Sequence, residues 1–278
     1  MSGVAIGLAL FAAVLHAAWN AFLRTGSDRL WTVTVMSFSS TGVAIALALF
    51  STLPPATAWP YIATSALLQV GYSLFLVAAY RQGELGQIYP IVRGSVPLLV
   101  TLGGFVMANE QLTRLQTLGV LLVAGGIISL SFGKNRAQTK SILYALATGT
   151  IIAGYATVDA IGVRKAGEAG GYTAWVLLIY GALLPATFVA LRGRLRFDLR
   201  SSETLKALAG GGVALVAYGV VVAAFALGPA GPIAAIRETS VVFAAFIGWL
   251  FLGERLTPRR AVACAVVALG AVSLGYRG

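Results

Sequence analysis

Two apolar stretches of the same design constrain this chain more than any other feature. Residues 86–113 read GQIYPIVRGSVPLLVTLGGFVMANEQLT, and residues 231–257 read GPIAAIRETSVVFAAFIGWLFLGERLT. Each is long enough to cross a bilayer, carries one arginine early in its apolar run (Arg93 or Arg237), and ends in Glu-x-Leu-Thr. A charge at the centre of a bilayer costs roughly 2.5–3.5 kcal/mol on insertion scales, so both arginines need a structural or functional reason.

The spacing of these stretches predicts an internal repeat. The two Glu-x-Leu-Thr motifs, at 110–113 and 254–257, lie 144 residues apart in a chain of 278 residues. A repeat of about half the chain divides it into two similar units. We therefore expect a first unit at 1–134 and a second at 135–278.

The composition assigns the chain to a membrane. It is 58% hydrophobic and 10% charged, whereas soluble domains are usually about 45–50% apolar and about 25% charged. A spanning helix needs about 20 apolar residues. We predict ten spans, at 3–24, 30–50, 58–80, 85–108, 114–132, 140–163, 171–191, 203–227, 230–252 and 258–276.

Ten spans in two repeats give five spans in each. Because five is odd, the second unit enters the bilayer in the opposite sense, as in the inverted repeats of many secondary transporters. The predicted fold class is an all-α polytopic membrane protein, with two inverted five-helix repeats around a central cavity. A single chain then contains both halves of a pathway, so a monomer suffices, although a homodimer through the fifth or tenth span is possible.

The distribution of positive charge predicts the orientation. Of the 20 Lys and Arg residues, 14 lie in the loops after the odd-numbered spans, 4 on the other side, and 2 inside spans. The positive-inside rule therefore puts the odd-numbered loops in the cytoplasm and both termini outside. The net charge of +11 reflects these short loops, and we expect a lipid bilayer and no nucleic acid as partner.

The sequence offers no enzyme site. One cysteine and one histidine exclude an internal disulfide and a Cys/His metal cluster. No Ser-His-Asp set and no phosphate-binding loop is recognisable; the glycines at 210–212 lack the lysine and the strand that such a loop needs. We expect neither catalysis nor a metal nor a cofactor.

Three groups of motifs resemble one known family. They are His16-Ala-Ala-Trp-Asn-Ala21 in the first span, Tyr89-Pro-Ile-Val-Arg-Gly-Ser95 with Glu110-Gln-Leu-Thr113, and Arg237-Glu-Thr-Ser-Val241 with Gly253-Glu-Arg-Leu256. Together they are similar to the EamA-type branch of the drug/metabolite transporter superfamily. The resemblance covers essentially the whole chain, with Asn109 where the family usually has glycine. It implies a ten-span exporter in a bacterial inner membrane, of a type similar to aromatic amino acid exporters.

The intramembrane charges are the first candidates for a site, because such charges usually mark substrate or ion paths. Arg93 lines a cavity or braces backbone carbonyls that Pro90 and Pro97 leave open. Arg237 and Glu238 are helix neighbours and do not face each other; each therefore has a partner on another helix or lines the cavity. Asp159 pairs with one of the arginines across the bundle or caps a helix end near Gly162.

Uncharged polar residues complete the candidate site. His16 is either a proton carrier or a helix–helix hydrogen-bonding group, with Asn20 one turn further on the same face. Tyrosines inside spans, with Gln69, suit an aromatic, hydrogen-bonding wall: Tyr72, Tyr89, Tyr155, Tyr180 and Tyr218. We expect the first, third, fourth, sixth, eighth and ninth spans to wall the cavity. The predicted substrate-binding set is His16, Asn20, Gln69, Tyr72, Tyr89, Arg93, Tyr155, Asp159, Tyr218, Arg237 and Glu238.

The predicted function is export of amino acids, among them aromatic ones, or of related small metabolites, by alternating access. One alternative is a multidrug or other metabolite exporter of the same fold. A second is a membrane component that does not transport. The sequence alone leaves the substrate and the coupling ion open.

Overall fold

The computed structural model describes most of the chain. It covers residues 1–24, 28–82, 85–132, 138–251 and 257–275. At a few helical positions it describes the backbone alone, namely 19–24, 77, 79–82, 85–87, 247–248 and 251. All structural statements below concern these described parts.

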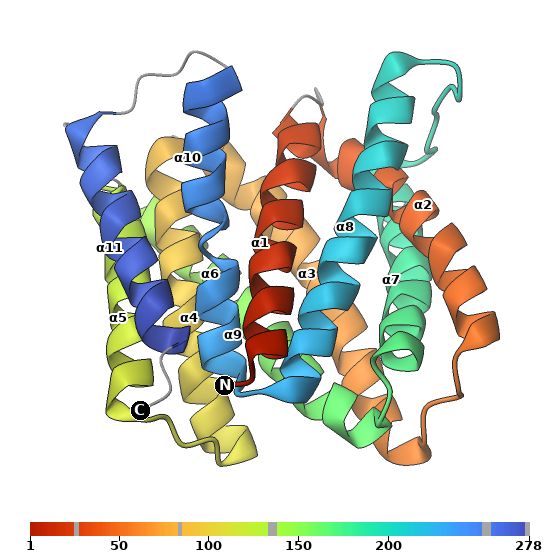
Figure 1. Ribbon diagram of the computed structural model, residues 1–278. Helices are drawn as coiled ribbons and strands as arrows, with labels where there is room; N and C mark the ends of the chain where they lie inside the picture. The colour runs from red at the N-terminus through yellow and green to blue at the C-terminus, as the bar shows by residue number, and fades with distance from the viewer. Residues whose placement is uncertain (25–27, 83–84, 133–137, 252–256, 276–278) are drawn as a thin grey trace.

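The described chain is helical from end to end (Figure 1). Its α-helices, with one short 3-10 helix (Ala56–Ala58) before α3, are α1 (Gly3–Arg24), α2 (Arg29–Phe50), α3 (Trp59–Gln82), α4 (Leu85–Ala108), α5 (Arg114–Ser129), α6 (Thr139–Ala166), α7 (Ala169–Arg192), α8 (Ser202–Leu227), α9 (Ala230–Arg237), α10 (Ser240–Phe251) and α11 (Pro258–Gly275).

The helices have the length and surface of membrane spans. Six of the described helices (α2, most of α4, α6, α7, α8 and α11) are long and apolar enough to cross a bilayer. Large apolar side chains are exposed around the bundle, including Phe50 at 90%, Val272 at 70% and Phe105 at 60%. Soluble monomers rarely expose so much contiguous apolar surface. The predicted all-helical, multi-pass class is therefore confirmed for the described residues, while the inverted repeat stays a prediction.

The main helix pairings follow a regular scheme. α1 packs on α8 and α3 on α6; α2 packs on α8 and α3 on α7; α4 packs on α6, and α1 on α9 and α10. The contacts are related by an exchange of α1 with α6, α2 with α7, α3 with α8, α4 with α9–α10 and α5 with α11. Under this exchange the α1–α8 contact becomes α6–α3, the α2–α8 contact becomes α7–α3, and the α4–α6 contact becomes the contact of α9 and α10 with α1. The pairs α2–α7, α4–α9 and α5–α11 are exchanged with themselves. In Figure 1, α5 and α11 stand at one end of the bundle and α2 and α7 at the other.

The predicted span 230–252 is not one continuous helix. α9 ends at Arg237 and α10 begins at Ser240. Between them the backbone tightens, because the amide of Thr239 donates to the carbonyl of Ile236 at 3.0 Å and that of Val242 to Thr239 at 2.8 Å. Such i→i+3 bonds mark a 3-10 turn inside a helix. The prolines of this stretch lie at the start of α9 and not at the break, with Pro229 as the N-cap of the helix.

The two Glu-x-Leu-Thr motifs have a local structural role. Thr113 is the N-cap of α5, where its hydroxyl accepts from the amide of Gln116 at 3.3 Å and its own amide donates to the Gln116 side chain at 3.0 Å. This is a capping box, which satisfies two otherwise unpaired amides. Thr257 occupies the same place before α11 and accepts from the amide of Arg260. The second motif's residues 254–256 lie outside the described residues.

Close contact between α5 and α11 depends on glycine. A Cβ atom on Gly119 would lie 2.7 Å from the Leu274 side chain and 2.8 Å from the carbonyl oxygen of Gly270, whereas one on Gly125 would meet nothing within 4 Å. Small residues at such contacts let membrane helices approach closely. Small residues of α5 and α11 therefore let these two helices pack closely against each other.

We predict that Gly119→Ala destabilises the protein and that Gly125→Ala does not. Overpacking a close contact typically costs about 1–3 kcal/mol, and the obstructing atom here includes backbone that cannot rotate away. Thermal unfolding in detergent measures the difference, with Gly125→Ala as the control for helix propensity. Equal melting temperatures for the two variants would contradict this account of the α5–α11 contact.

Candidate functional site

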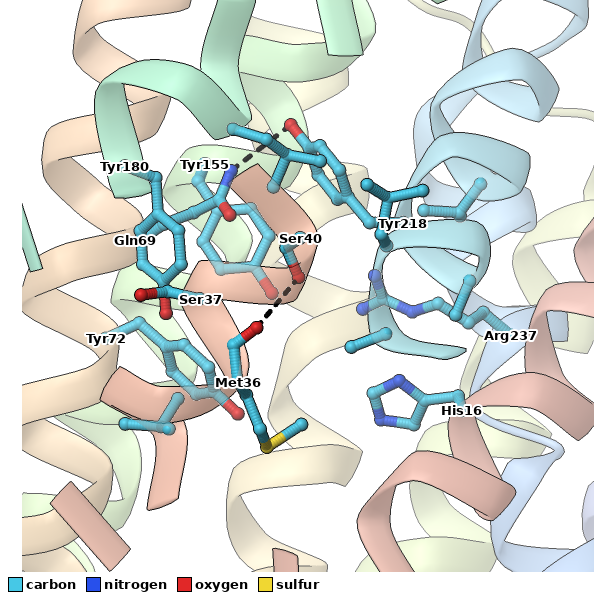
Figure 2. A pocket seen from close by; sticks show the side chains of 16 residues that line it. His16, Met36, Ser37, Ser40, Gln69, Tyr72, Tyr155, Tyr180, Tyr218 and Arg237 are labelled. Atoms are coloured by element: carbon cyan, nitrogen blue, oxygen red, sulfur yellow. Dashed lines mark hydrogen bonds between the residues drawn. The ribbon is translucent and has the colours of Figure 1, made fainter. Parts of the chain in front are cut away.

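A cavity of about 130 Å³ lies between the helices near the middle of the bundle (Figure 2). Its lining comes from α1, α2, α3, α6, α7, α8 and α9. Six predicted site residues line it: His16, Gln69, Tyr72, Tyr155, Tyr218 and Arg237. The structure thus brings together side chains that lie as much as 221 residues apart in the sequence.

One side of the cavity is aromatic. The rings of Tyr72 and Tyr155 lie 6.0 Å apart at 59°, and the hydroxyl of Tyr180 is 3.2 Å from that of Ser73. Figure 2 shows these three tyrosines on one side of the pocket and Arg237 with His16 on the other. Aromatic rings beside a few polar groups are typical of pockets that bind amphipathic small molecules.

Arg237 belongs to a buried cluster of three charges. A single oxygen of Glu238, Oε1, accepts from Nη2 of Arg237 at 3.1 Å and from Nη1 of Arg93 at 3.2 Å. Glu238 is fully buried, and the two arginines are 4% and 5% exposed. The cluster joins α4 to the break between α9 and α10, and it carries one net positive charge.

The contact between Arg237 and Glu238 corrects our expectation that these neighbours do not face each other. That expectation assumes a continuous helix, in which successive side chains point about 100° apart. Here the regular helix ends at this pair, with Arg237 as the last residue of α9 and Glu238 as its C-cap. The two long side chains meet all the same, with Nη2 of Arg237 at 3.1 Å from Oε1 of Glu238.

Two polar atoms of the cluster can each form a further hydrogen bond. Among the described residues, Glu238 Oε2 and Arg237 Nε are buried and have no hydrogen-bond partner. An unpaired buried donor or acceptor costs about 1–3 kcal/mol, and more when it is charged. A ligand that reaches the Arg237 side of the cluster therefore meets an unpaired N–H and an excess positive charge.

Asp159 is held by hydroxyl groups. Its Oδ1 accepts from the Tyr172 hydroxyl at 2.9 Å and its Oδ2 from the Tyr218 hydroxyl at 3.0 Å. Neither expected role is seen, since it makes no ion pair among the described side chains and its oxygens are engaged by tyrosines rather than by a helix end. The carboxylate lies behind the cavity wall, and the Tyr218 hydroxyl, which also accepts from Gln69 Nε2 at 3.2 Å, connects it to the cavity.

Residues 139–276 match the EamA-like transporter family.

The match covers the second predicted unit almost completely. It supports the prediction that the protein is a membrane transporter of small molecules. Among solved structures, one titled "Crystal structure of protein" is similar in fold, with a TM-score of 0.75 over 97% of this chain and 94% of that chain. At 20% identity this likeness concerns the fold alone. No curated protein sequence matches the chain.

The fourth predicted span, contrary to our expectation, does not line the cavity. Arg93 is outside the cavity lining and lies over the ring of Tyr89, with 5.3 Å between guanidinium and ring centroid. Tyr89 and Glu238 likewise lie outside the lining. Arg93 is bonded to Glu238 rather than directed into the cavity. The side chain of Asn20 lies outside the described residues.

The sequence missed the contribution of α2 and, apart from Tyr180, that of α7. Met36, Ser37 and Ser40 of α2 and Leu177 of α7 line the cavity. The run of hydroxyl residues in α2 was a possible signal, but Ser40 also donates to the Gly211 carbonyl of α8 at 2.9 Å. Serine and threonine occur both where a side chain bonds a neighbouring backbone carbonyl and where it faces a cavity. Sequence alone therefore does not distinguish the two roles.

Polar contacts tie together one end of the bundle. Glu110 pairs with Arg164 at 2.7 Å and accepts from the Ala230 amide at 2.8 Å, while Arg164 donates to the Gly228 carbonyl at 2.6 Å. At the same end Glu168 accepts from the Thr52 amide at 3.0 Å, and hydrogen bonds from Thr52 lower the pKa of this carboxyl. The start of α9 is thus fixed to the segment that follows α4 and to the end of α6.

We predict that Glu238→Gln destabilises the protein strongly. The change leaves two buried arginines without a counter-charge, and removing one partner of a buried ion pair typically costs roughly 3–5 kcal/mol. Thermal unfolding in detergent, with Glu203→Gln on the exposed start of α8 as control, measures it. The double variant Arg93→Gln/Glu238→Gln removes one charge of each sign and should recover part of the loss. An undisturbed Glu238→Gln protein would contradict the role of the cluster.

Proposed function

We propose that the protein is a secondary transporter that exports amino acids or related small carboxylates, including aromatic ones, by alternating access. The observation that carries the proposal is the pairing, within one cavity, of an aromatic wall with the guanidinium of Arg237. A solute with a carboxylate at one end and an apolar ring at the other matches both sides. The match of residues 139–276 to a transporter family supports transport across the membrane as the task.

The charge of the Arg237 cluster favours an acidic group on the solute. Two arginines share the single carboxylate of Glu238, so the cluster has one positive charge in excess. A carboxylate that enters the cavity supplies the missing negative charge. Arg237 offers the unpaired Nε–H, and a guanidinium binds carboxylates through parallel hydrogen bonds. We assign Arg237 to the solute and Arg93 to holding Glu238 in position.

We also propose that the chain consists of two inverted repeats, 1–134 and 135–278, both in a bacterial inner membrane with the termini outside. The exchange scheme of the helix pairings supports this arrangement, as does the equivalence of Thr113 and Thr257 as caps. Inverted repeats allow the cavity to open to either side by rocking one unit against the other. Since both units are in one chain, a monomer is sufficient.

We predict that Arg237→Ala abolishes transport with little effect on folding. The substitution leaves Arg93 and Glu238 as a neutral pair, so the cluster stays balanced. The solute loses a charged contact worth about 2–5 kcal/mol, which lowers its affinity by at least about tenfold. Counterflow of radiolabelled amino acids in liposomes, at equal protein content, measures this. Arg196→Ala, in the exposed loop between α7 and α8, is the control.

The same assay decides between substrate classes. Export of aromatic amino acids that is lost in Arg237→Ala and kept in Arg196→Ala supports the proposal. Transport of organic cations but of no carboxylate would favour a multidrug exporter. A well-folded Arg237→Ala protein that transports amino acids at the wild-type rate would contradict the role assigned to Arg237.

A further inference from the structure

Gln69 of α3 lines the cavity and has a fixed orientation (Figure 2). Its amide nitrogen, Nε2, donates to the Ser65 hydroxyl at 3.0 Å and to the Tyr218 hydroxyl at 3.2 Å. A side-chain amide has two N–H hydrogens and one oxygen that only accepts. Both hydrogens of Gln69 are thus engaged within the protein.

The hydroxyl groups around Asp159 determine which end of the Gln69 amide faces them. Tyr218 and Tyr172 give their hydrogens to the two oxygens of Asp159, at 3.0 and 2.9 Å. The buried Ser65 hydroxyl is a further hydrogen-bonding partner of Asp159 and of both tyrosines. With its own hydrogen given away, the Tyr218 oxygen can only accept from Gln69. An amide oxygen at 3.2 Å would face it with no hydrogen between the two atoms, so the nitrogen must be the end that faces Tyr218.

The same constraint turns the Gln69 oxygen, Oε1, away from Ser65 and Tyr218. Within the part of the chain that the structure describes, no donor is bonded to Oε1, and Oε1 is not one of the enclosed polar atoms that lack a partner. It is therefore an acceptor in contact with the open space of the cavity. Figure 2 shows the nitrogen joined to Tyr218 and the oxygen on the other side of the amide.

The two sides of the cavity carry opposite charges. Arg237 borders the cavity, and the ion cluster to which it belongs has one positive charge in excess. On the other side, a chain of hydrogen bonds runs from Gln69 through Tyr218 to the Asp159 carboxylate. Such a chain polarises each of its members and here increases the negative charge on Oε1. A solute with a negative end at Arg237 and a positive end at Gln69 matches both sides.

We propose that Oε1 of Gln69 accepts a hydrogen bond from the ammonium group of the solute, and that the cavity thereby selects α-amino acids over carboxylates without an amino group. This inference rests on the proposed function, in which Arg237 holds the carboxylate. Both residues line one cavity of about 130 Å³, which is small enough for a single compact solute to contact them together. Ser65 and Tyr218 are positioning residues, because they hold the amide in the orientation that directs Oε1 into the cavity.

Three matched probes separate the contribution of the ammonium group from that of the carboxylate. L-Phenylalanine carries both groups, 3-phenylpropanoate the carboxylate alone and 2-phenylethylamine the ammonium alone. Their binding to the purified chain is measured by calorimetry at about pH 6, where amino groups are protonated and carboxyl groups ionised. We expect the wild type to bind L-phenylalanine roughly 10- to 100-fold more tightly than 3-phenylpropanoate, the range for one hydrogen bond to a charged group.

Variants assign this preference to Gln69. Gln69→Leu removes the amide at similar side-chain size and should lose most of the preference, while its affinity for 3-phenylpropanoate stays close to that of the wild type. Gln69→Glu keeps an acceptor oxygen in either protonation state and should keep the preference, as should Gln138→Leu, at an exposed glutamine that makes no cap bond to α6. Equal weakening of both acids in Gln69→Leu, or loss of the preference in Gln69→Glu, overturns the proposal.

The probes also distinguish failure of this inference from failure of the proposed function. If the wild type binds both acids equally well, the ammonium site fails and the carboxylate class stands. If neither acid binds, the proposed substrate class fails and 2-phenylethylamine reports on the ammonium site alone. Binding of this amine that Gln69→Leu weakens and Arg237→Ala does not would retain the site, whereas binding unaffected by Gln69→Leu, or no binding of any probe, would remove it.

Discussion

A single buried carboxylate, Glu238, holds the centre of this molecule together. Burying two arginines inside a membrane domain is unfavourable unless a counter-charge meets them, and Glu238 meets both with one oxygen. It can do so because the ninth span is broken at this residue. The break and the ion cluster thus depend on each other: the turn delivers the carboxylate, and the carboxylate fixes α4 to α9.

The polar core consists of groups that lie behind the cavity and groups that line it. Arg93, Glu238 and the tyrosine-bound Asp159 lie behind the cavity, while Arg237, Tyr218 and Gln69 reach it. Two of the groups behind the cavity bond groups that line it: Glu238 bonds Arg237, and Asp159 bonds Tyr218. The buried charges are thereby held inside the bundle and next to the cavity. This arrangement is the physical basis for binding a solute with an acidic group, as we propose.

The sequence predicted the helices well and the lining less well. Apolar run length is a direct consequence of bilayer thickness, so each predicted span lies on described helix to within a few residues at its ends, except for the break of the ninth span at 238–239. The break there leaves no sequence signal, because Arg237 to Ser240 is as compatible with a helix as with a turn. Likewise, Arg93 and Arg237 occupy equivalent places in the two repeated stretches, but only the second is next to a break and reaches the cavity.

The hydroxyl residues of α2 that line the cavity were overlooked for a related reason. Their hydroxyl groups bond backbone carbonyls within the helices and between them, as Thr41 does with Ser37 and Ser39 with Leu208. Which of them also faces an open space depends on side-chain volumes across several helices, and one sequence does not encode that in a readable pattern.

The most direct test of the account is an experimental structure of the protein with L-phenylalanine bound. We expect the carboxylate within hydrogen-bonding distance of the Arg237 guanidinium and the ring against the aromatic wall of Tyr72 and Tyr155. A ligand bound elsewhere, or bound in the cavity with its carboxylate turned away from Arg237, would contradict it.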